Sequence, residues 1–194
     1  MKPDTESTNT KAQSMPGLFR NFAAACAALL LSGCFLSEKP LIGEGVYIHD
    51  GPLAFCLDGD EPCHQTTLQE DAYLVLPHPE DGEERPISVR FRPLMEAGGQ
   101  TIWLGEADLS EDEDEEAWAY VVARKLKDTD LGVREYEVAV PDCSGASASD
   151  LFRYGLEKEG SYSCRVTDID AFSEYLREHH GDDFADDAWW EKAR

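Results

Sequence analysis

Short stretches in which apolar and polar residues alternate recur along most of the chain. In residues 87–92 the apolar positions are Ile87, Val89 and Phe91, and residues 118–123 and 134–140 have the same period of two. That period puts alternate side chains on opposite faces of a β-strand, so one apolar row can face a core. Similar stretches, bounded by turn residues, predict strands at 46–49, 53–57, 72–76, 87–92, 102–107, 118–123, 134–140, 152–156 and 162–166.

The predicted strands follow one another without a helical interruption. This order predicts a mainly β fold, an antiparallel meander that forms a barrel or a sandwich. One helix is expected after the last strand, because residues 167–170 have the form of a capping signature, Ile169, Phe172 and Leu176 share a face, and Gly181 supplies a stop. The fold class is therefore a β domain with a C-terminal helix.

The N-terminus has the features of a secretion signal. Residues 22–31 are uncharged and mostly apolar, and Lys2, Lys11 and Arg20 precede them. A run of this length is too short for a bilayer core, which needs about 20 apolar residues. It ends in the sequence Leu31-Ser32-Gly33-Cys34.

Those four residues resemble the lipobox of bacterial lipoprotein precursors. The resemblance implies cleavage between Gly33 and Cys34, a diacylglycerol group on the Cys34 thiol, and N-acylation (palmitate, for example) of the freed amine. In many such proteins Asp after the cysteine disfavours the outer membrane; Phe35 stands here, which implies the periplasmic face of that membrane. The alternatives are an ordinary signal peptide, or a short buried helix with Cys34 as a core thiol.

The same features divide the chain into four parts. Residues 1–33 are the expected signal peptide, which shortens if translation starts at Met15. Residues 34–43 are expected to be a lipidated tether, because Pro and Gly lie near its end. Residues 44–181 form the β domain with its helix, and residues 182–194 form an acidic tail.

Four cysteines remain when Cys26 is removed with the signal and Cys34 is assigned to lipid. An even number in an exported chain predicts disulfides, and the pairs closest in sequence, Cys56–Cys63 and Cys143–Cys164, are favoured. A metal site at Cys56, Cys63 and His64 is the alternative, but the gap is wide and a second cysteine pair is missing. No metal is therefore predicted at these cysteines.

The charge balance restricts the partners. Lys+Arg total 17 and Asp+Glu 40, a formal net charge of −23, which excludes a general affinity for nucleic acid and adsorption to anionic lipid by charge. The acidic surface instead favours a basic protein of the envelope. The run Glu111 to Glu116 is expected to be a solvated hairpin loop or a weak divalent-cation site, and the same holds for Asp182, Asp183, Asp186 and Asp187. Adaptation to a salty habitat is another explanation of the charge.

Catalytic motifs are missing from the sequence. It contains no G-x-S-x-G, H-E-x-x-H, P-loop or G-x-G-x-x-G pattern. Ser144 is expected in a turn, and His179 and His180 at a polar helix end. The expected function is thus non-catalytic partner binding by an anchored domain, with no cofactor besides the lipid. A lipocalin-like carrier of an apolar ligand and, behind it, a hydrolase with an unrecognised site are the alternatives.

The scattered histidines and the aromatic residues leave further possibilities open. Nothing in the sequence orients His49, His64 or His78. Aromatic residues in the predicted strands either pack in the core or line a ligand cavity. The pair Trp189-Trp190 could dock on the domain, contact lipid, bind another protein or stay disordered. The aromatic residues in the predicted strands are Trp103, Trp118, Tyr120, Tyr136, Tyr154 and Tyr162.

Overall fold

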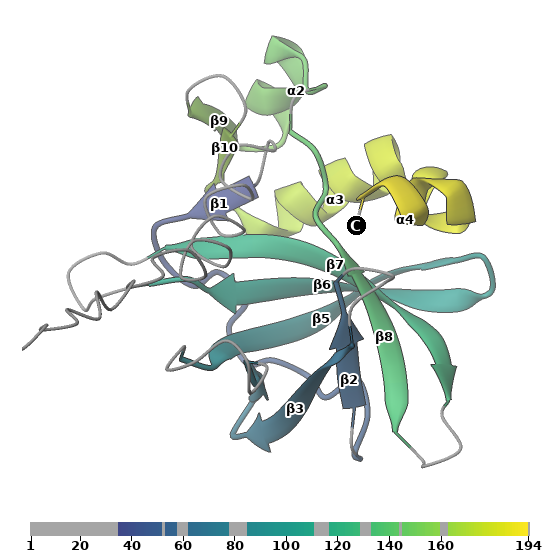
Figure 1. The fold of residues 1–194 in the computed structure, drawn as a ribbon. Coiled ribbons are helices and arrows are strands. Elements are labelled where there is room, and N and C mark those ends of the chain that lie inside the picture. Colours follow the sequence, from purple (N-terminus) through teal and green to yellow (C-terminus); the bar gives the residue numbers. More distant parts are fainter. Residues whose placement is uncertain are drawn as a thin grey trace, which may run out of the picture.

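A computed structural model describes residues 35–51, 53–57, 62–77, 85–110, 117–128, 133–143, 145–159 and 163–193. The predictions for the signal peptide, Cys34, His78, the run Glu111 to Glu116, Ser144 and Tyr162 lie outside these residues. The described part is mainly β, as predicted, with a C-terminal helix (Figure 1).

The described strands all belong to one mixed sheet, and most of the helical residues follow the last strand. The strands are β1 Phe35–Ser37, β2 Leu53–Cys56, β3 His64–Gln69, β4 Ala72–Val75, β5 Ile87–Ala97, β6 Gln100–Asp108, β7 Trp118–Asp128, β8 Arg134–Ala139, β9 Leu156–Glu159 and β10 Ser163–Val166. The helices are α2 Ala148–Arg153, α3 Ile169–His180, the 3₁₀ turn η1 Asp183–Ala185 and α4 Asp187–Ala193.

Strands β2 to β8 form a closed ring. Each pairs antiparallel with the next, as a meander does, and β8 returns to pair with β2. The closing pair is parallel, with Leu53 opposite Arg134 and Phe55 opposite Tyr136. Sequence periodicity indicates most of these strands but carries no information about this parallel pair.

Strand β7 is shared between the ring and a smaller group of strands. Its Trp118 and Ala119 pair with β1, whereas residues from Val122 onward pair with β8. Beyond β1 the sheet continues through β10, which is parallel to β1, to β9. Figure 1 shows β1, β9, β10 and α2 together at the end of the molecule opposite β2 and β3. We call this the anchor end: residues 35–39, α2, β9 and β10.

Two hydrophobic cores lie on the two sides of the wall made by β5, β6 and β7. Alternate residues of β6 serve both: Leu104 packs in the outer core beneath α3, and Trp103 packs against the core inside the ring. The next residue of β6 must be glycine, because a Cβ on Gly105 would lie 2.6 Å from the Phe91 ring and 2.8 Å from Val121. The ring is therefore tightly filled at this level.

The C-terminal helix lies where the sequence predicts it, but its N-cap is Asp168, the second residue of the predicted capping signature. The Asp168 carboxylate accepts the backbone N–H groups of Asp170 and Ala171 at 2.9 and 3.0 Å, which caps α3. Phe172 and Leu176 are fully buried in the outer core, and Gly181 is the C-cap. This helix covers the outer core over β5 and β6 and connects the anchor end to the C-terminal segment (Figure 1).

Local predictions fail in four places. Residues 46–49 are not a strand, and Phe152 belongs to α2, which a Ser147–Asp150 capping box begins. The sequence pattern does not predict β3, because its residues, HQTTLQ, are mostly polar and exposed. The expected acidic tail is folded over residues 183–193 as η1 and α4, and Trp190 is fully buried in the outer core.

Candidate functional site

The segment that was expected to be a tether is attached to the domain. Phe35 to Ser37 form β1, and the Phe35 side chain is fully buried against Phe172 and Tyr175, with ring centroids 4.6 and 5.6 Å away. Ile42 is also buried in the outer core. The prediction of a tether over residues 34–43 is therefore wrong for the described residues 35–43. Apolar side chains in a short Pro- and Gly-containing segment found places in the core.

A buried carboxylate holds the middle of this segment. Glu106 Oε1 accepts the backbone N–H of Leu41 at 2.6 Å and that of Ile42 at 3.1 Å, and the Tyr120 hydroxyl at 3.0 Å. The Tyr120 hydroxyl also lies 3.0 Å from Ser37 Oγ. Burial raises the pKa of both Glu106 and Tyr120. Glu106 Oε2 has no hydrogen-bond partner among the described residues. One oxygen of the carboxylate thus binds this segment and Tyr120, while the other is buried and unsatisfied.

A second carboxylate holds the next residues. Asp71 accepts the Gly45 N–H at 3.3 Å and pairs with Arg90, whose Nε lies 3.2 Å away. The Gly45 hydrogen bond, with help from Arg90, holds the pKa of Asp71 below its usual value. Val46 then donates to the Phe91 carbonyl at 2.8 Å.

The Tyr73 hydroxyl completes the attachment. It accepts the His49 N–H at 3.1 Å and donates to the His49 carbonyl at 3.0 Å. Successive contacts from Phe35, in the outer core, to Ile48 and His49, against the core inside the ring, thus hold the segment on the domain. We call residues 35–49 the strap.

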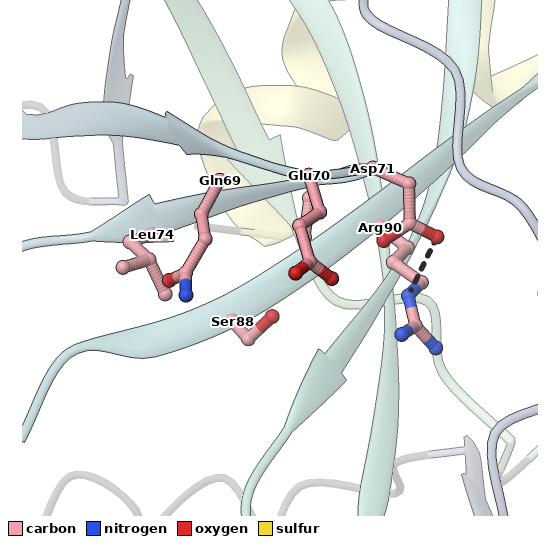
Figure 2. Close-up of a pocket in the computed structure, with 7 residues that line it drawn as sticks. Gln69, Glu70, Asp71, Leu74, Ser88 and Arg90 are labelled. Carbon is pink, nitrogen blue, oxygen red and sulfur yellow. Dashed lines mark ion pairs between the residues drawn. The ribbon is translucent and has the colours of Figure 1, made fainter.

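A depression lies beside the strap on the outer face of β4 and β5 (Figure 2). Asp71 and Arg90 form one wall and are already paired with each other, while Glu70, in the β3–β4 turn, has a left-handed φ of 52°. The other labelled lining residues, Gln69, Leu74 and Ser88, add little apolar surface. Small-ligand sites are enclosed and mostly apolar, so this open, polar depression is not suited to an apolar ligand.

The inside of the ring is occupied by aromatic side chains. The Phe55 ring lies 5.3 Å from Phe91, 6.0 Å from Tyr73 and 6.5 Å from Tyr136, between ring centroids. All four are nearly or fully buried. The described strands therefore enclose packed aromatic rings where a lipocalin-like carrier needs space for its ligand.

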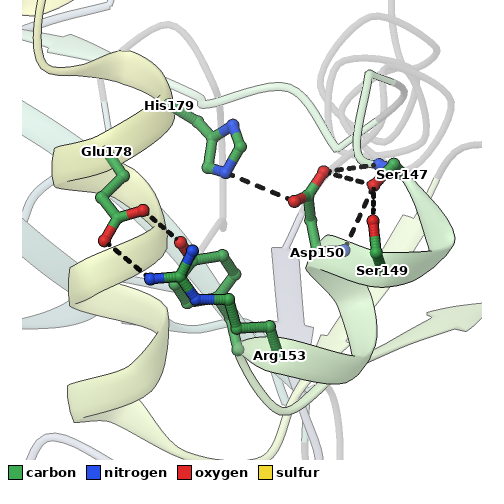
Figure 3. Close-up of polar contacts among 7 residues, drawn as sticks. Ser147, Ser149, Asp150, Arg153, Glu178 and His179 are labelled. Carbon is green, nitrogen blue, oxygen red and sulfur yellow. Dashed lines mark hydrogen bonds and ion pairs between the residues drawn. The ribbon is translucent and has the colours of Figure 1, made fainter.

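Ser147, Asp150 and His179 come together, in a way that resembles a catalytic triad only in composition (Figure 3). The Ser147 hydroxyl lies 2.5 Å from an Asp150 oxygen, and His179 Nε2 lies 3.7 Å from the other oxygen. In a triad the imidazole stands between serine and carboxylate, whereas here the carboxylate is central. The Ser147 hydrogen bond lowers the pKa of Asp150, and the pair is the capping box of α2.

The same region joins α2 to α3. Arg153 pairs with Glu178 at 3.1 Å, and the Tyr154 hydroxyl donates to the other Glu178 oxygen at 2.5 Å (Figure 3). This hydrogen bond raises the pKa of Tyr154 to about 12. His179 stacks on Tyr175, with centroids 4.7 Å apart, so it is part of an aromatic cluster as well as of the polar helix end that the sequence predicted.

The predicted cysteine pairs are the ones that the structure contains. Cys56 is bonded to Cys63, and Cys143 to Cys164. Within the described residues, one group could geometrically hold a metal ion, and it consists of Cys56, Cys63 and Glu135. Its two sulfurs form the disulfide and are not available as thiolates. His64 is oriented after all, because its Nδ1 lies 3.1 Å from the Leu76 carbonyl oxygen.

The C-terminal segment is held by Arg124. This buried guanidinium pairs with Glu137 at 2.8 Å and Asp187 at 2.7 Å, and it lies over the Trp190 ring at 4.6 Å from the centroid. Of the alternatives that the sequence leaves open for the Trp189-Trp190 pair, docking on the domain is the one that Trp190 adopts.

The aspartates of this segment point to separate partners. Asp183 lies 3.1 Å from His180 Nδ1, Asp187 pairs with Arg124, and Asp186 accepts the Ala188 N–H at 3.0 Å. They do not converge as ligands of one cation do. Burial lowers the pKa of His180, which is packed against Phe184 and Trp189.

Comparisons with known proteins assign the chain to no group. No protein-family model, no curated protein and no solved structure matches it. None of the described helices is long and apolar enough to cross a membrane.

Proposed function

We propose that this chain is an envelope lipoprotein whose acidic β domain, held at a membrane by lipid on Cys34, binds a basic protein. One observation carries the anchoring part. The sequence Leu31-Ser32-Gly33-Cys34 follows a short apolar run and stands directly before β1, the first strand of the folded domain. Two disulfides fit an exported protein, because cytosolic thiols are kept reduced.

The acidity supports the binding part. Residues 168–193 contain nine carboxylates and only Arg177 and Lys192 as fixed cations. Such a field steers basic partners toward the domain and accelerates their association at low salt. A basic envelope protein or a basic segment of one is the expected partner.

The contacts of the candidate residues support a role without catalysis. Ser147 serves as a helix cap, the sulfurs of Cys56 and Cys63 are oxidised, and Glu106 holds the strap. Each of these described groups thus has a structural task. The filled ring likewise favours protein binding over a small-ligand carrier.

Anchoring is tested on the mature N-terminus. Mass spectrometry of protein purified from membranes should find acylated Cys34 as the first residue. A Cys34→Ala variant should appear in the soluble envelope fraction, with Cys26→Ala as the matched control that stays with the membrane. Retention of an intact leader on the membrane-bound protein would refute the proposal.

Partner binding is tested by capture from an envelope extract at low and high salt. A basic protein should be retained at low salt and released at high salt. An unrelated domain of equal net charge is the control. If both domains retain the same proteins, the binding part of the proposal is wrong.

A further inference from the structure

We propose that the anchor end of this protein rests on the lipid bilayer, with the Phe152 side chain at the membrane interface. The inference depends on the lipid anchor proposed for Cys34 and assigns a membrane-facing surface to it. Chain continuity, charge balance and one exposed aromatic ring point to the same end of the molecule.

Chain continuity places this end close to the lipid. A ten-residue tether could extend by about 35 Å, whereas consecutive Cα atoms are about 4 Å apart. Phe35, the neighbour of Cys34, is fully buried and paired with Cys164 across β1 and β10. Further contacts attach the strap to the domain as far as His49. Lipid on Cys34 would therefore hold the anchor end within a residue's length of the headgroups.

Charge is balanced at this end, although the chain as a whole has a net charge of −23. Arg165, on β10, pairs with Glu38, which follows β1, at 2.9 Å and with Glu157 on β9 at 3.8 Å, and it also pairs with Glu159. The charged residues of the anchor end are Glu38, Lys39, Asp150, Arg153, Glu157, Lys158, Glu159 and Arg165, four acidic and four basic. A surface without net charge can lie on anionic headgroups, whereas residues 168–193, with their nine carboxylates, are repelled by them.

The most exposed large apolar side chain of the described residues lies at the same end. Phe152, on α2, is 92% exposed, while the other large apolar side chains at the surface are exposed by 45% or less. Its neighbour Leu151 packs against the outer core, and Arg153 pairs with Glu178, so α2 is fixed with Phe152 facing outward. An aromatic ring beside charged groups is suited to the membrane interface.

Tryptophan quenching tests the contact on the full-length, processed protein. A Phe152→Trp variant is reconstituted into vesicles of phosphatidylethanolamine and phosphatidylglycerol that contain a phospholipid with brominated acyl chains. Its added emission should be quenched several-fold more strongly than that of Leu68→Trp, a control on β3, which lies at the opposite end (Figure 1).

A charge reversal sharpens the test. Adding Lys39→Glu and Lys158→Glu to Phe152→Trp should reduce the quenching at low salt and restore it at high salt, because salt screens repulsion from anionic lipid. Adding Lys192→Glu on α4 instead should leave the quenching unchanged.

Mass spectrometry of the same samples separates the two proposals. Acylated Cys34 with equally weak quenching of Phe152→Trp and Leu68→Trp would overturn the membrane contact and leave the anchor intact. An unmodified Cys34 would overturn the anchor, and the contact with it.

Discussion

The Glu106 carboxylate accepts the backbone N–H of Leu41 across 2.6 Å, although the two residues are 65 positions apart in the chain. This hydrogen bond lies at the centre of the strap and turns a segment with the composition of a linker into part of the folded body. The membrane contact proposed for the anchor end depends in part on the strap, because a segment held along its length keeps Cys34 close to the domain.

We expect Glu106→Ala to destabilise the domain and to release the strap. The substitution removes the acceptor of three hydrogen bonds, two of them buried, and leaving a buried donor unsatisfied costs about 1–3 kcal/mol. Urea unfolding should show the loss, and hydrogen exchange should show faster exchange at Leu41 and Ile42. Glu44→Ala, at an exposed position of the strap, is the control. Unchanged exchange at Leu41 would contradict the role of Glu106.

The pH dependence of stability should show the buried state of Glu106. Its pKa is raised above the ordinary 4.5, so the folded protein retains this proton to higher pH than the unfolded chain. The stability that the protonated group contributes is present below the unfolded pKa and declines as the pH rises through the folded pKa. The difference in unfolding free energy between wild type and Glu106→Gln should therefore shift against the wild type as the pH rises above 4.5. A constant difference across this range would count against the raised pKa.

Arg124→Ala should be among the most damaging single substitutions. It leaves the buried Glu137 carboxylate without this guanidinium, and breaking a buried ion pair from one side typically costs 3–5 kcal/mol. Protection of α4 from proteolysis should fall with it, because Arg124 also contacts Asp187 and Trp190. Asp187→Asn is the comparison: that side chain is 87% exposed, so a change of about 1 kcal/mol or less is expected. An equal loss of unfolding free energy in the two variants would show that the buried pair of Arg124 and Glu137 does not dominate the stability of this region.

The two disulfides should differ in their contribution to stability. Loop-closure entropy predicts a loss of about 2.5 kcal/mol for the shorter loop, between Cys56 and Cys63, and about 3.5 kcal/mol for the longer one. Paired Cys→Ser substitutions, compared by thermal unfolding, measure each. A larger loss from Cys56→Ser with Cys63→Ser would show that effects other than loop length dominate.

The period of apolar and polar positions explains why much of the fold could be predicted from the sequence. The alternation at Ile87, Val89 and Phe91 reports a strand whatever its partner is, and the Asp168 cap reports the start of α3 from local contacts alone. The cysteine pairs were accessible for a related reason, since residues close in sequence meet most easily. The candidate site was less accessible, because Glu106 differs from other acidic residues only in its burial.

The sequence by itself determined most strands of the meander, the C-terminal helix, the cysteine pairs and the lipobox-like motif, because each depends on residues that are near one another along the chain. Only the tertiary structure decided that β2 closes the ring against β8, that the tail folds onto Arg124, and that the expected tether is a strap. These features join residues that are distant in sequence, and whether an apolar side chain such as Phe35 or a carboxylate such as Glu106 is buried depends on the whole fold.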